Sequence, residues 1–135
     1  MEKEQVIDAS AMLAYFRKEH DYEKMNDLLF KASNSGKNLL INVVNWGEVY
    51  YILAKTLGLK EAEYIVGLMD EFPITLVPAD HAIAMQAAKY KVEKRLSYVD
   101  GFTAATAKIF NAALVTADHD FKIVRDEIEI IWINK

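Results

Sequence analysis

Short apolar runs alternate with longer segments of mixed polarity along this chain. The run Leu39–Ile41 is too short for a helix and is typical of a strand buried in a parallel sheet. Apolar residues between Met25 and Ala32 recur instead at helical spacing, and Gly36 provides a helix stop. The pattern predicts strands at 5–8, 39–41, 74–77, 114–115 and 128–133, and helices at 11–16, 21–36, 44–57, 60–71, 82–92 and 100–110.

This alternation of strands and helices predicts an α/β fold. A mostly parallel central sheet of about five strands, covered by helices on both faces, accommodates such an order. The length of 135 residues suits one domain, and no repeat, linker or low-complexity tract divides the chain. We therefore expect a single domain over residues 1–135.

The composition narrows the function classes. A net charge of −4 does not announce a nucleic-acid-binding protein, although it does not exclude a local basic patch. The absence of cysteine excludes disulfides and thiolate metal sites. The charged start Met1–Gln5 and the lack of a long apolar run predict a cytoplasmic protein with no signal peptide and no membrane segment.

Four acidic residues fall at special positions in this pattern. Asp8 and Asp118 each end a predicted strand, and Asp100 lies where a helix is expected to open. Glu48 is a lone acid in an otherwise apolar predicted helix. The carboxyl ends of parallel strands and the starts of the following helices share one edge of a sheet, so we expect the four acids to converge there.

Converging carboxylates raise each other's pKa, and a shared cation relieves that repulsion. Hard oxygen ligands without cysteine suit Mg²⁺ or Mn²⁺. Such a metal lowers the pKa of a bound water and stabilises charge on a phosphodiester. The four acids therefore predict a divalent-metal site with hydrolytic chemistry.

The segments around these acids resemble the four motifs of the PIN domain, in order and spacing, over essentially the whole chain. Within that family, the chain resembles the VapC-type toxins of prokaryotic toxin–antitoxin pairs. The resemblance implies an Mg²⁺- or Mn²⁺-dependent endoribonuclease that cuts RNA to leave a 5′-phosphate and a 3′-hydroxyl and inhibits translation. It also implies a homodimer held inactive by a cognate antitoxin. The segments are Val6-Ile7-Asp8-Ala9-Ser10, Asn45-Trp46-Gly47-Glu48, Tyr98–Ala107 and Leu114–Phe121.

By position, Asp8, Glu48, Asp100 and Asp118 match the family's catalytic, metal-binding quartet. The resemblance also assigns supporting residues: Ser10 and Thr116 match hydroxyls that hydrogen-bond the acids or metal-bound water, Asp120 matches a frequent extra acid, and Asn45 shares the Glu48 motif. One departure is Gly101, where alanine is commoner in the family.

Basic residues offer two interpretations. Lys89, Lys91, Lys94 and Arg95 precede the Asp100 helix, and Arg17 follows the first helix. They form either solvated faces or patches that contact RNA phosphates. His119 is expected to be an exposed turn residue rather than a ligand, and the same holds for the unpartnered His20 and His81.

Several apolar residues suggest partner surfaces. The run from Tyr50 to Leu53 is either core or a symmetric dimer surface. Tyr15 and Phe16 are expected to be exposed and to receive an antitoxin helix.

Two other functions fit parts of the pattern. A haloacid-dehalogenase-like phosphatase also begins with an acid at a strand end, but it needs a second acid two positions on, where this chain has Ser10. A catalytically silent PIN-like binding scaffold would be expected to have lost one of the acids, and this chain has all four.

Overall fold

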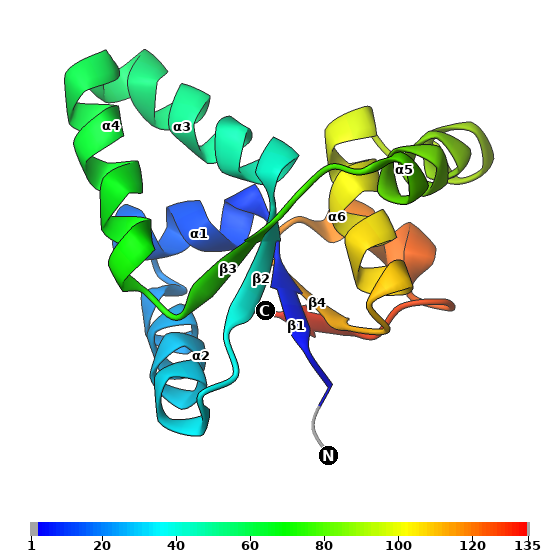
Figure 1. Ribbon diagram of the computed structural model, residues 1–135, viewed down its shortest axis with the longest axis horizontal. Helices are drawn as coiled ribbons and strands as arrows, with labels where there is room; N and C mark the ends of the chain where they lie inside the picture. The colour runs from blue at the N-terminus through cyan, green and yellow to red at the C-terminus, as the bar shows by residue number, and fades with distance from the viewer. Residues whose placement is uncertain (1–2, 135) are drawn as a thin grey trace.

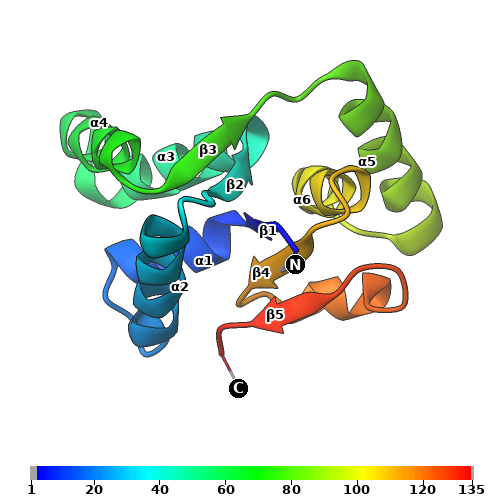
Figure 2. The same ribbon diagram turned by 60° about the horizontal axis from the view of Figure 1, so that its bottom comes forward.

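The computed structural model describes residues 3–134 and contains a five-stranded sheet in the order β3-β2-β1-β4-β5 (Figures 1 and 2). All four strand pairs are parallel, which confirms the predicted α/β architecture. The strands are β1 Gln5–Ile7, β2 Leu39–Asn42, β3 Ile74–Val77, β4 Ala113–Thr116 and β5 Ile130–Trp132. The helices are α1 Ala9–Phe16, α2 Tyr22–Ser35, α3 Val43–Leu57, α4 Leu59–Gly67, α5 His81–Lys94 and α6 Tyr98–Ile109, with 3₁₀ helices η1 Leu68–Glu71 and η2 His119–Val124.

Adjacent residues of the central strands belong to opposite cores, as the two-residue period of a strand requires. Ile7 and Val115 pack with α1, α2, α3 and α4 on one face. Val6 and Leu114 pack with α5, α6 and η2 on the other. Figure 1 shows these two groups of helices on either side of the sheet, so helices cover both faces as predicted.

Several boundaries differ from the prediction because polar side chains cap helices at other positions. Asp8 is the N-cap of α1, and its carboxylate accepts from the backbone N–H of Ala11, so the helix begins at Ala9 and not at the predicted residue 11. Ser97 caps α6, so Asp100 lies inside the first turn and does not open the helix. The predicted strand 128–133 pairs only over Ile130–Trp132.

The predicted helix 60–71 is two segments, since α4 ends at Gly67 and the chain continues as the 3₁₀ helix η1. The segment between β4 and β5 contains the 3₁₀ helix η2. Asn111, between α6 and β4, has a left-handed φ of 51°. None of the helices in residues 3–134 combines the length and hydrophobicity needed to cross a membrane.

Candidate active site

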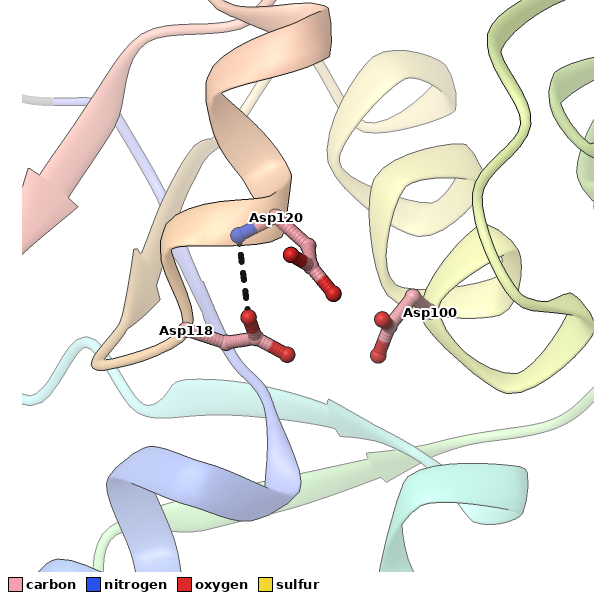
Figure 3. A group of neighbouring side chains, drawn as sticks. All are labelled: Asp100, Asp118 and Asp120. Carbon is pink, nitrogen blue, oxygen red and sulfur yellow. Dashed lines mark hydrogen bonds between the residues drawn. The ribbon is translucent and has the colours of Figure 1, made fainter.

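Three carboxylates meet at the carboxyl edge of the sheet. One oxygen from each of Asp100, Asp118 and Asp120 lies within 4.8 Å of the others. Figure 3 shows Asp100 reaching from α6 toward the two aspartates that follow β4. The fold therefore brings together acids from the third and fourth motifs, one on α6 and two after β4.

Local backbone hydrogen bonds hold two of these acids in place. The N–H of Asp120 donates to the Asp118 carboxylate at 2.9 Å, so Asp118 caps η2 (Figure 3). The Asp118 N–H donates to the Thr116 hydroxyl at 2.8 Å. Asp100 sits in the first turn of α6, where the helix dipole favours negative charge.

Asp8, directly after the end of β1, is almost completely buried, with 3% of its surface exposed. Its carboxylate accepts from the Ser10 hydroxyl at 2.8 Å, from the Thr116 hydroxyl at 2.6 Å and from the Ala11 N–H at 2.9 Å. Because Thr116 also accepts from the N–H of Asp118, its hydroxyl links the two acids. Ser10 in turn accepts from the N–H of Ala117 at 3.0 Å.

Burial is the main cause of the raised pKa values of three of these acids, and neighbouring carboxylates add to it. Burial raises the pKa of Asp8 to about 7, against its hydrogen bonds, and the charge of Asp100 adds to the rise. Burial and then the charge of Asp118 raise the pKa of Asp100 to about 6. Burial and the charges of Asp100 and Asp118 raise the pKa of Glu48. Glu48 is half-buried on α3, and neither it nor Asp8 belongs to the group of three close oxygens found in residues 3–134.

The oxygen spacing fits a small divalent cation. Ligands on opposite sides of an octahedral Mg²⁺ lie about 4.2 Å apart, since each bond is about 2.1 Å. Oxygens within 4.8 Å of one another need little movement to reach that spacing. Burial and the repulsion between neighbouring acids together raise the pKa values of Asp100 and Glu48. A bound cation would offset that repulsion.

Asn45, expected only to support the site, is buried between α3 and α6. Its side chain accepts a hydrogen bond from the Thr103 hydroxyl and donates to the backbone carbonyl of Val99 at 3.4 Å. Three further buried polar residues were missed in the sequence: Asn42, Thr103 and Thr106. The available signal was the polarity of Thr103 and Thr106 in an otherwise apolar part of α6, and of Asn42 at the end of the apolar strand β2.

The basic residues divide into two groups. Lys94 is half-buried and forms ion pairs with Asp126 and Glu127, at 3.7 Å and 3.6 Å, so its charge is already matched. The other predicted RNA contacts, Lys89, Lys91, Arg95 and Arg17, are exposed.

The group of close carboxylates found in residues 3–134 includes no histidine. His119 is exposed and stacks on Trp132, with ring centroids 4.9 Å apart. His20 and His81 are exposed.

The predicted exposure of Tyr15 and Phe16 is wrong. Both are half-buried because their rings pack against Phe72, with centroids 5.6 Å and 6.0 Å away. In the run from Tyr50 to Leu53, Leu53 is core and Tyr51 is 53% exposed, so core and surface alternate along α3.

Together, the parallel sheet and the acids at its carboxyl edge define an α/β domain with a candidate site for a divalent cation. The model of the PIN domain matches residues 6–127, and the chain belongs to the PIN domain family, which confirms the resemblance. No curated protein sequence matches the chain.

Solved structures share the fold at low identity. A DNA-bound VapBC complex from Salmonella typhimurium gives a TM-score of 0.74 at 15% identity, covering 97% of this chain and 98% of that one. FitAcB from Neisseria gonorrhoeae gives 0.72 at 15%, covering 96% and 97%. VapC20 of Mycobacterium tuberculosis, described as a toxin that cleaves the sarcin–ricin loop, gives 0.68 at 13%, covering 92% and 95%. The chain thus has the fold of VapC-type toxins.

Proposed function

We propose that this protein is a divalent-metal-dependent endoribonuclease and the toxin of a toxin–antitoxin pair that inhibits translation. The observation that carries the proposal is the group of Asp100, Asp118 and Asp120 oxygens, with Asp8 and Glu48 beside it. PIN domain membership and the fold shared with VapC20 support RNA as the substrate.

The acids have distinct roles in this proposal. Asp100 and Asp118 hold Mg²⁺ or Mn²⁺ together with Asp120, and Glu48 completes or orients the set. Three donors already occupy the Asp8 carboxylate, and a carboxylate offers about four acceptor positions. Asp8 therefore has little capacity left to bind the cation directly. When bound, the cation supplies a water of lowered pKa and positive charge for the phosphodiester. Ser10 and Thr116 fix the orientation of Asp8.

The similar solved structures support one of the proposed partners. The VapBC and FitAcB complexes support a cognate antitoxin for this chain. Exposed apolar side chains on α3 and α4 provide contact area for that antitoxin or for a second copy in a homodimer. They are Tyr51, Leu57, Leu59 and Tyr64. The exposed Lys89, Lys91 and Arg95 are the proposed RNA phosphate contacts.

The test is cleavage of a mixed cellular RNA pool by purified protein with Mn²⁺, with Mg²⁺ or with EDTA. We expect metal-dependent cuts that disappear in Asp100→Asn and persist in Asp70→Asn, a matched change at an exposed acid in η1. Absence of cleavage by folded protein, free of antitoxin, would favour the binding scaffold. Equal cleavage by Asp100→Asn would remove that residue from the mechanism.

A further inference from the structure

Two buried polar contacts join α3 to α6 in a regular register. Asn42, the N-cap of α3, lies opposite Thr106, and Asn45 lies opposite Thr103. A step of three residues forward on α3 is therefore matched by a step of three back on α6. Continued by one more step of three residues, the same register brings Glu48 of α3 level with Asp100 of α6.

These contacts satisfy the groups that form them. Asn42 donates to the Thr106 hydroxyl at 3.1 Å and accepts from the N–H of Val44 at 2.9 Å. Thr106 donates to the carbonyl of Phe102 at 2.7 Å. The four side chains of the two pairs, Asn42, Asn45, Thr103 and Thr106, are at most 1% exposed.

Buried polar pairs fix the alignment of two packed helices more strictly than apolar contacts do. Apolar side chains of similar size would fill the same space but would tolerate rotation of one helix against the other. Rotation of α6 here would leave buried amide and hydroxyl groups without partners, which is costly. The polar pairs therefore specify one alignment of α3 and α6.

Repulsion between two acids opposes this alignment at the end of the helices that faces the site. Glu48 and Asp100 carry like charges, and their repulsion acts to separate the two helices where they meet the site. The two helices pack mainly in different cores. Val49 and Leu53 of α3 belong to the core of Ile7, whereas α6 belongs to the core of Val6, which α3 reaches through Val44. A direct link between the two helices therefore helps to keep both acids on one cation.

We propose that the Asn42–Thr106 and Asn45–Thr103 pairs are positioning pairs that hold Glu48 against Asp100 and so complete the cation site. This rests on the proposed function, because it assigns these pairs a role in binding the metal. Their hydroxyls and amides act through the two acids and touch neither cation nor substrate. Support of ligand residues by surrounding hydrogen bonds commonly changes metal affinity by 10–100-fold.

The test measures Mn²⁺ binding alone, by isothermal titration calorimetry. Thr103→Val keeps the shape but removes the donor to Asn45, and we expect Mn²⁺ affinity to fall about tenfold. Thr103→Ser keeps the hydroxyl and is expected to restore it. Ile83→Val, a buried change in α5, controls for lost stability and should leave the affinity unchanged. Thr106→Val tests the second pair if Thr103→Val fails to fold.

A double-variant comparison separates positioning from general damage. If Thr103 acts through Glu48, Thr103→Val should have little further effect on Mn²⁺ affinity in a Glu48→Gln background. Unchanged Mn²⁺ affinity in folded Thr103→Val, or an equal loss in both backgrounds, would overturn the positioning role while leaving the nuclease proposal intact. A wild-type protein that binds no Mn²⁺ and cuts no RNA would overturn both.

Discussion

The buried carboxyl of Asp8 makes the metal-free protein less stable as pH rises. Burial raises the pKa of Asp8 from 3.8 to about 7 in the folded protein. Between these two values the folded protein keeps a proton that the unfolded chain has lost, so the free energy of unfolding falls by about 1.4 kcal/mol per pH unit. The full loss is about 4 kcal/mol, reached near pH 7 and constant above it.

The perturbation is Asp8→Asn, which removes the titration and keeps an oxygen to cap α1. Urea unfolding in EDTA at pH 4, 5.5 and 7.5 measures the free energy of unfolding of both proteins. We expect the difference between the variant and the wild type to shift in favour of the variant by up to about 4 kcal/mol from pH 4 to pH 7.5. Excess Mn²⁺ should stabilise the wild type at pH 7.5, since a cation favours the ionised carboxylates. Parallel pH profiles of the two proteins in EDTA would refute this account of Asp8.

Two further changes test packing and charge at residues outside the proposed metal ligands. In Gly101→Ala the new Cβ would lie 2.9 Å from the carbonyl oxygen of Ala87, so a clash of about 1–3 kcal/mol should exceed a helix-propensity gain of up to about 1 kcal/mol and lower the melting temperature. Gly47→Ala has open space and should raise it, so a melting temperature of Gly101→Ala above wild type would contradict the packing. In Glu127→Gln the loss of the 2.9 Å pair with Lys108 should cost less than about 1 kcal/mol at pH 7 in urea unfolding. Because that pair lowers the pKa of Glu127, the difference should vanish as pH falls through it, and a difference that persists at pH 3 would exclude the charge as its cause.

The parallel sheet and its cover of helices on both faces follow from patterns that the sequence displays. Short apolar strands and amphipathic helices are local signals, and right-handed crossovers leave few arrangements for them. Helix starts were harder to place, because several polar residues near each start compete for the cap. Asp8 and Ser97 are the N-caps, so α1 and α6 each begin before the predicted residue. The position of the cap depends on where the preceding strand or turn ends.

The candidate site was partly visible in the sequence. Convergence of acids could be expected from their places at strand ends, because topology alone brings those ends together. The closeness of Asp120 to Asp100 could not, since it depends on the 3₁₀ turn that Asp118 caps. Gly101 shows the same limit, since only the approach of Ala87 explains why glycine stands where alanine would favour the helix.

The pairs between α3 and α6 show why the remaining geometry needed a structure. A threonine or asparagine in a helix has no partner that the sequence names, and Asn45 and Thr103 are far apart along the chain. Once α3 and α6 are docked, the same residues become costly in every alignment except the one that pairs them. That alignment faces Glu48 toward Asp100, an arrangement which the charges of the two acids oppose in the absence of a cation. In the proposed cation site, the buried polar pairs therefore restrain α3 against α6, so that Glu48 and Asp100 can bind one cation despite their like charges.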